Sequence, residues 1–206
     1  MLKTTIDDHA NPDVLMIAKG ILKGYIKHPT LFMCRLLPRV VKIQNEMNKN
    51  IPLDIRKLLA LTIAMYSLFR ENMEKDQALS LLKAVIIPVG LVKQMSIFRY
   101  VEQPEHSFHN LVASSKRFKQ EGPMRLNKMK IVEESDDTYI FHVLNCIFIS
   151  VFGHFGVSEL TDVFCSVDNA SYNIYAADEI VFTRGGRDIT ITRGNRTCDF
   201  ICKKCN

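Results

Sequence analysis

Five of the six cysteines fall in the last third of the chain, where thiols could act as nucleophiles, metal ligands or packing groups. They are Cys146, Cys165, Cys198, Cys202 and Cys205. Asp168 follows Cys165 by three positions, about one helical turn, so their side chains can meet on a helix. A thiol beside a carboxylate supplies a nucleophile and a proton-transfer group. His142, four positions before Cys146, and Asp199, next to Cys198, add further polar groups to this region.

The spacing Cys198-x3-Cys202-x2-Cys205 resembles that of the iron–sulfur ligands in radical S-adenosylmethionine enzymes. Here the triplet closes the sequence, and no long β/α barrel follows it, so we do not expect a cluster. If 197–203 is a strand, Cys198 and Cys202 share one face because side chains alternate at period two. Burial of that face explains both residues. Cys34 lies among apolar helix residues and is expected to be a buried small hydrophobe.

The first 123 residues carry helical apolar spacing, interrupted by proline and glycine. We expect a helix beginning near Pro12, a second apolar stripe kinked or ended at Pro38, and a helix after Pro52. A fourth helix should run from about Glu74 to Ile87 and end at Pro88. A fifth should cover about residues 107–120.

After Pro123 the pattern changes to short strands mixed with helices. Strands are expected at 129–133, 138–143, 178–183, 187–192 and 197–203, and helices at 144–155 and 158–172. The pair Gly185-Gly186 predicts a hairpin between the third and fourth of these strands. The fold class is therefore α+β: a helical N-terminal two thirds packs on a small antiparallel sheet with two helices in the C-terminal third. Residues 1–123 form the helical region and 124–206 the α+β region that carries the cysteines, together one compact domain.

Composition and charge narrow the function classes. Hydrophobic residues are 47% and charged residues 24%, a balance typical of globular proteins and not of disordered ones. Residues 1–130 hold 21 Lys and Arg against 11 Asp and Glu, and residues 131–206 hold 6 against 11. The basic residues lie along predicted helices, so we expect solvated helix faces and no nucleic-acid partner. The short apolar runs and the lack of a leader-like start predict no membrane contact, reduced thiols and a cytoplasmic location.

Four ordered segments together resemble the L-2-amino-thiazoline-4-carboxylic acid hydrolase family. They are Phe-His-Val-Leu-Asn-Cys at 141–146, Phe-Gly-Val-Ser-Glu-Leu at 155–160, Cys-Ser-Val-Asp at 165–168, and the tail from Arg187 through Gly194 to Cys-Asp-Phe at 198–200. The similarity covers roughly residues 125–203, with a looser helical match upstream.

This resemblance implies hydrolysis of a cyclic, non-peptide carbon–nitrogen bond in a small carboxylate-bearing substrate by cysteine-based chemistry. It implies catalytic roles for Cys146, Cys165, Asp168 and Cys198, in which Cys146 or Cys165 is the thiolate and Asp168 the acid and base. Arg187 would hold the substrate carboxylate, and His142 and Asp199 would complete the binding site. No cofactor is implied, and oligomer formation stays open.

The sequence leaves other interpretations open. Asn145 stands where relatives often have a basic residue, and Asn195-Arg196 where the turn is often acidic, which affects the expected substrate. Zinc held by Cys146, Cys165, Cys198 and either a carboxylate or His142 is the metal alternative. A non-catalytic small-molecule or metal-binding sensor module of similar α+β plan is the main functional alternative. A third is a helical interaction protein that uses the basic N-terminal half.

Overall fold

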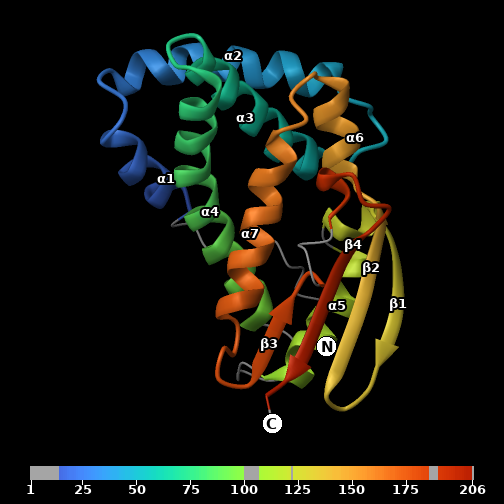
Figure 1. The fold of residues 1–206 in the computed structure, drawn as a ribbon. Coiled ribbons are helices and arrows are strands. Elements are labelled where there is room, and N and C mark those ends of the chain that lie inside the picture. The colour runs from blue at the N-terminus through green and yellow to red at the C-terminus, as the bar shows by residue number, and fades with distance from the viewer. Residues whose placement is uncertain (1–13, 100–106, 122, 186–189, 206) are drawn as a thin grey trace, which may run out of the picture. The chain divides into compact units, whose positions relative to one another are not determined.

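The computed structural model describes residues 14–99, 107–121, 123–185 and 190–205 (Figure 1). Within these ranges the chain forms seven α-helices and one four-stranded antiparallel sheet, which confirms the α+β class. The chain divides into two compact units, described separately here. One comprises Pro12–Gly90 and Phe148–Val167, which we call the helical unit, and the other includes Leu91–Ile147 and Asp168–Asn206, which we call the sheet unit.

The helical unit contains α1 (Val14–Lys23), α2 (Pro29–Glu46) and α3 (Leu53–Arg70), with the first part of α4 (Lys75–Arg99). Most of α6 (Ile147–His154) and the start of α7 (Leu160–Ile174) also belong to it. Helix α3 is the most buried of these elements, and Leu59 and Ile63 lie in the core as its apolar spacing predicted. Phe32 of α2 stacks on Phe69 of α3 at 5.9 Å between ring centroids, which joins the two helices.

Two prolines do not end helices as the sequence predicted. Helix α2 continues through Pro38, and α4 continues through Pro88 to Arg99. A proline removes one backbone hydrogen bond and crowds the preceding turn, a local cost that packing along the rest of a long helix can outweigh. The prediction of a helix end at Pro88 was therefore wrong, and of the two alternatives at Pro38 the helix end is excluded, whereas the kink stays a prediction.

Because α4 continues past Pro88, it is long enough to be compared with membrane-crossing helices. The segment Lys75–Met95 has the length and composition of a membrane-crossing helix, with a mean hydropathy of 1.6 in an 18-residue window, 28% of which is buried inside the structure. Among the described residues one helix meets this criterion, which is weak evidence because core helices of soluble proteins meet it too. The sequence prediction rested on uninterrupted apolar runs, which stay short here because polar residues such as Lys83 and Lys93 interrupt them.

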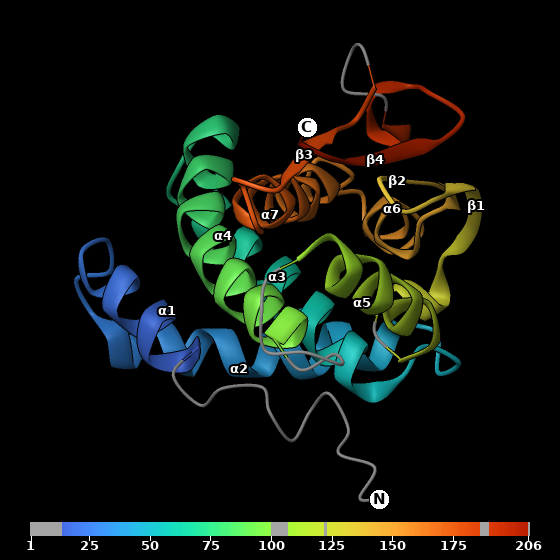
Figure 2. The same cartoon turned by 90° about the horizontal axis from the view of Figure 1, so that it is seen from below.

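The sheet unit contains β1 (Lys128–Glu134), β2 (Thr138–Asn145), β3 (Ile180–Thr183) and β4 (Cys198–Lys204) in the order β1-β2-β4-β3. The hairpin of β1 and β2 confirms the first predicted strand pair. Helices α5 (Phe108–Glu121) and α7 lie on one side of the sheet (Figures 1 and 2). Aromatic side chains fill the space between helices and sheet, including Phe98, Tyr139, Phe141, Tyr172, Tyr175 and Phe200.

The predicted strand 187–192 is wrong where the structure describes it. Ile191–Arg193 forms a short 3₁₀ helix, η3. The strand that pairs with β3 is β4, which follows this helix in the chain. Gly194 ends η3 with a φ of 84°, a left-handed conformation that glycine adopts without a steric cost. Arg187 itself lies outside the described residues.

Candidate functional site

The sheet separates the predicted site residues onto its two faces. Alternation along β4 places Cys198, Phe200 and Cys202 on the buried inner face. Asp199, between them, lies on the outer face opposite His142 of β2. The sequence prediction that Cys198 and Cys202 share a face is confirmed. The same alternation places Cys198 and Asp199 on opposite faces.

A buried guanidinium lies at the inner face, directly after β3. The Arg184 side chain is 3% exposed, and its guanidinium carbon lies 3.8 Å from the centre of the Phe200 ring and 5.6 Å from that of Phe182. Its Nε donates a hydrogen bond to Asn169 Oδ1 at 2.8 Å. Its Nη2 lies 3.5 Å from Asp168 Oδ2, which is at the upper limit of hydrogen-bond length. The cation is therefore stabilised by a ring face, an amide and a carboxylate.

Cys198 lies on the same inner face of β4, two positions before the Phe200 ring that Arg184 contacts, and we call Asp168, Arg184 and Cys198 the acid–arginine–thiol cluster. The backbone N–H of Ile191 donates to Cys198 Sγ at 3.1 Å. Burial raises the pKa of the Cys198 thiol, while the Ile191 N–H and the Arg184 guanidinium act in the opposite direction. Asp168 also influences this thiol electrostatically. The cluster thus joins a carboxyl, a fixed cation and a thiol that is protonated at neutral pH.

Asp168 has the environment of a proton-transfer group. Burial raises its pKa, against the opposing effect of Arg184, yet a third of its side chain stays exposed to solvent. A carboxyl with a raised pKa is a stronger base when ionised and a usable acid when protonated. One side of this carboxyl therefore contacts the buried cation and the other is accessible.

The other two buried groups near the cluster are less suited to chemistry. Burial raises the pKa of Cys202 to about 12, with Arg184 opposing the shift. Burial also raises the pKa of Tyr172, whose hydroxyl lies 3.5 Å from Ser115 Oγ. Both residues belong to the packed aromatic core.

A second polar pair lies on the outer face of the sheet. His142 Nε2 is 3.5 Å from Asp199 Oδ1, and the Thr197 hydroxyl donates to the same oxygen at 2.7 Å. The structure therefore brings together two of the predicted binding residues, but on the face of the sheet that is turned away from Cys198.

The remaining predicted residues lie elsewhere. Cys146 follows β2 and packs, partly buried, against the aromatic core of the sheet unit. Cys165 lies on α7 in the helical unit, three positions before Asp168, where the chain enters the sheet unit. Cys34 and Cys205 are exposed, so the prediction of a buried Cys34 was wrong. All six cysteines are described, and each is a thiol.

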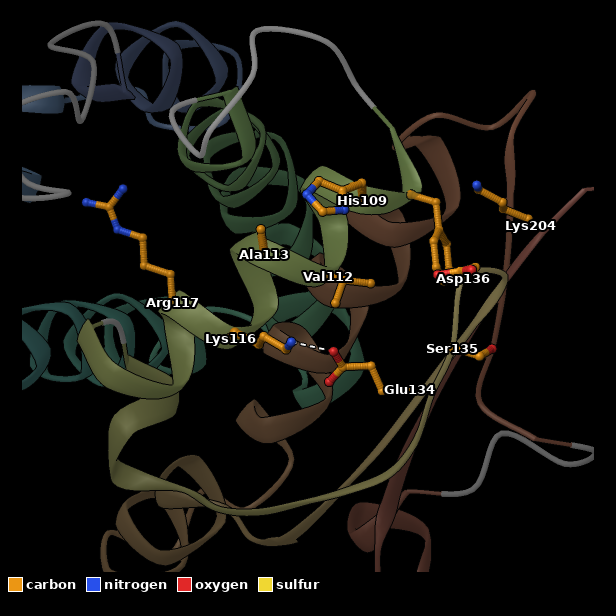
Figure 3. Close-up of a pocket in the computed structure, with 10 residues that line it drawn as sticks. His109, Val112, Ala113, Lys116, Arg117, Glu134, Ser135, Asp136 and Lys204 are labelled. Carbon is orange, nitrogen blue, oxygen red and sulfur yellow. Dashed lines mark hydrogen bonds and ion pairs between the residues drawn. The ribbon is translucent and has the colours of Figure 1, made fainter.

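A wide hollow opens in the sheet unit between α5 and the tip of the β1–β2 hairpin (Figure 3), with a volume of about 1010 Å³. Its lining is mixed in charge, because Lys116 and Lys204 line it together with Glu134 and Asp136. Lys116 pairs with Glu134, and the Lys204 ammonium lies 5.7 Å from the Phe108 ring centre. None of the predicted site residues that the structure describes lines this hollow.

Arg184 is the functional candidate that sequence reasoning missed. Ile180 and Phe182 point inward on β3, and the same period of two predicts that Arg184 points inward at the end of the strand. A charged residue at an inward position of a strand is the sequence signal that indicates Arg184. The resemblance to the family instead indicates Arg187 as the cation that holds the substrate carboxylate. Within the described residues, no three His, Cys, Asp or Glu side chains lie close enough together to hold a metal ion.

The fold and the cluster define the chain as an α+β protein in which a buried arginine pairs with a partly exposed carboxyl at the inner face of the sheet, where a buried thiol also lies. The model of the L-2-amino-thiazoline-4-carboxylic acid hydrolase family matches residues 55–202. Because the match spans more than half of the sequence, the chain belongs to this family. It begins well upstream of the C-terminal segments that carried the resemblance and includes α3, α4 and α5. No curated protein and no solved structure gave a significant match.

Proposed function

We propose that the protein is a hydrolase that opens a cyclic or amide-like carbon–nitrogen bond in a small carboxylate-bearing substrate. Membership of the amino-thiazoline-carboxylic acid hydrolase family supports the reaction class. The observation that carries the assignment to particular residues is the acid–arginine–thiol cluster, because it holds an acid–base group and a thiol beside a fixed cation.

In this proposal Cys198 is the nucleophile and Asp168 transfers the protons. Burial keeps the Cys198 thiol protonated, so a base must remove its proton, and the raised pKa makes ionised Asp168 a better base than an ordinary carboxylate. The thiolate adds to the amidine-like carbon. The carbon–nitrogen bond then breaks, and the nitrogen takes the proton from Asp168. Asp168 then deprotonates a water molecule, which attacks the acyl-type intermediate and releases it from sulfur. Asp168 returns this proton to the Cys198 thiolate.

Arg184 is a positioning residue in this scheme. Its contacts to Asn169, Asp168 and the Phe200 ring fix the carboxyl and offset negative charge that develops near the thiol. Arg187, predicted from the sequence to hold the substrate carboxylate, keeps that role as part of the proposal.

The test measures turnover of 2-amino-thiazoline-4-carboxylate by mass spectrometry of the ring-opened product. Cys198→Ser and Asp168→Asn should each lower kcat by at least about a hundredfold. Arg184→Lys should lower kcat and shift the acid limb of the pH–rate profile, which a purely structural role would not do. Cys146→Ser and Cys165→Ser compare the other thiols, and Lys204→Ala in the hollow is the matched control that should retain turnover.

If every cysteine variant keeps full activity, the cysteine mechanism is wrong, and if Asp168→Asn also keeps it, the cluster is not the site. A covalent adduct on the Cys198 peptide, trapped by acid quench during turnover, would support the nucleophile directly. An adduct on Cys146 or Cys165 instead would move the nucleophile to that residue.

The mixed-charge hollow favours a second candidate, a small-molecule binding module without catalysis. Its opposed cations and carboxylates suit a zwitterion such as an amino acid derivative. Binding of 2-amino-thiazoline-4-carboxylate that Lys204→Ala abolishes, without turnover, would favour this candidate over the hydrolase.

A further inference from the structure

Helix α2 of the helical unit exposes an apolar face as well as burying one. Its inner side includes Leu36, which is buried, and Phe32, which stacks on α3. Met33, Leu37 and Val41 recur at four-residue spacing on another side and are 45%, 57% and 57% exposed. A surface helix normally turns polar residues outward, so two apolar faces indicate that the second one is covered in the functional state.

The exposed apolar side chains are concentrated in one stretch of the chain. Tyr25, Leu31, Met33, Leu37 and Val41 are five of the ten large hydrophobic residues that are exposed within the described ranges. We call these five residues, with the basic residues of α1 and α2, the basic apolar surface. The stretch 14–45, which is blue in Figure 1, contains all of them.

The same stretch contains basic but no acidic residues, and Glu46 follows it as the last residue of α2. Residues 14–45 contain no Asp or Glu and six Lys and Arg. They are Lys19, Lys23, Lys27, Arg35, Arg39 and Lys42. Arg35 and Arg39 pair with Glu71, which follows the last residue of α3, and the four lysines are exposed. On α2, Lys42 lies about 100° further round the helix than Val41, whereas Arg35 lies about 200° from Met33, on the side away from the exposed apolar face. Within the described part of the chain, the unpaired cations of this surface are therefore the four lysines.

The charge and the exposed apolar side chains together indicate which kind of partner could bind the basic apolar surface. A second copy of the chain docked symmetrically here would bring two sets of cations together and would be repelled. A nucleic acid would complement the charge but would leave the exposed aliphatic side chains unburied. A bilayer with anionic headgroups satisfies both, because lysines bind the headgroups while the apolar side chains enter the acyl boundary.

We propose that α1 and α2 form a peripheral binding surface for membranes rich in anionic lipid. This differs from the sequence-based expectation of no membrane contact, which rested on the length of apolar runs and not on exposure. It is compatible with the predicted cytoplasmic location, because the cytoplasmic leaflet carries the anionic lipids. The surface does not include the acid–arginine–thiol cluster, so the proposal is independent of the proposed hydrolysis.

The test is co-sedimentation of the full chain with phosphatidylcholine vesicles, with and without about one third phosphatidylserine. Binding should require phosphatidylserine and fall when salt rises from about 0.1 M to about 0.5 M. Leu37→Gln with Val41→Gln should weaken binding at least about tenfold, and Lys19→Gln, Lys23→Gln and Lys27→Gln together should do the same. Val181→Gln is the matched control, a valine that is 52% exposed on β3, and it should bind like the wild type.

Thermal melting of each variant checks that the fold is retained. Absence of binding to the anionic vesicles would overturn the proposal, as would equal loss of binding in the Val181→Gln control. Light scattering provides the remaining comparison. A dimer that Leu37→Gln with Val41→Gln dissociates, in a protein that ignores vesicles, would assign the surface to a second copy and also overturn the proposal.

Discussion

Arg184 shows how a charge is retained in the interior of this protein. An arginine can be buried where its planar cation stacks on a ring and its N–H groups find oxygen acceptors. Phe200 supplies the ring, and Asn169 and Asp168, from adjacent positions of α7, supply the acceptors. Asp168 experiences two opposed effects, since burial raises its pKa and the guanidinium lowers it. The net effect is a raised pKa, which makes the ionised carboxylate a stronger base, and the proposed reaction uses this property.

At the same scale, burial should divide the cysteines by reactivity. Exposed Cys34 and Cys205 should react with iodoacetamide at pH 8, whereas Cys202 should not. With a pKa of about 12, roughly one Cys202 thiol in 10,000 is ionised at that pH, and the side chain is inaccessible. Peptide mass spectrometry after timed alkylation measures the order, and unfolding in urea should make all six residues reactive. Early labelling of Cys202 in the folded protein would contradict the structure.

At the scale of elements, a polar contact joins parts of the helical unit that are distant in sequence. The Tyr66 hydroxyl of α3 donates to Glu159 Oε1 at 2.8 Å, and Lys75 at the start of α4 lies 3.1 Å from the same oxygen. Burial opposes ionisation of Glu159, but hydrogen bonds and Lys75 lower its pKa below 4.5 overall. Burial and the bond to Glu159 raise the pKa of Tyr66 to about 12, so the tyrosine remains a donor at neutral pH.

This contact should make part of the stability depend on pH. A carboxyl whose pKa is lowered by folding contributes stability above its unfolded pKa and loses it as the pH falls through the folded value. Glu159→Gln should therefore cost up to about 1 kcal/mol at pH 7 and progressively less below pH 4.5. Urea unfolding of both proteins at pH 7 and at pH 3.5 measures the difference. A cost that does not change with pH would show that the charge of Glu159 contributes nothing.

Helices α4 and α7 approach closely at Gly90. A Cβ atom there would lie 2.7 and 2.8 Å from the two methyl carbons of Val167, both within the helical unit. Gly90→Ala should thus destabilise the protein by about 1–3 kcal/mol through overpacking. Gly20→Ala in α1 is the matched control, because nothing lies within 4 Å of its Cβ position and alanine favours helix by up to about 1 kcal/mol. Equal melting temperatures for the two variants would contradict the close approach.

At the scale of the whole molecule, each unit is assembled from separate parts of the chain. The sheet unit takes α5 and the end of α4 from before residue 123, and the helical unit takes residues 148–167 from after it. The sequence pattern changes from helical to mixed at residue 123, but this change does not mark a boundary between the two units. The contacts within each unit cross residue 123.

A fragment that begins after residue 123 should not fold. Residues 124–206 alone lack Phe98, Phe108, Leu111 and Phe118, which pack in the core of the sheet unit. Losing several buried aromatic and aliphatic side chains at once exceeds the stability of a typical domain. Circular dichroism and amide NMR dispersion should show a largely unfolded fragment. A cooperative thermal transition in the isolated fragment would contradict this expectation.

Local patterns explain why much of the architecture could be predicted. The apolar spacing of α3, the polar turn before β2 and the alternation of Cys198 and Cys202 depend only on neighbouring residues. Predictions failed where a long-range contact outweighed a local preference. Pro38 and Pro88 remain within helices, and Ile191–Arg193 forms a 3₁₀ helix where local alternation predicted a strand.

The sequence by itself determined the α+β class, most helices, the β1–β2 hairpin and the family, since these follow from periodicity and ordered motifs. Only the tertiary structure decided which groups share a site. Whether a side chain at the end of a strand meets a helix or solvent depends on packing between segments far apart in the chain. For that reason Arg184, which the motif did not single out, is found beside Asp168, while His142 and Asp199 lie on the opposite face of the sheet.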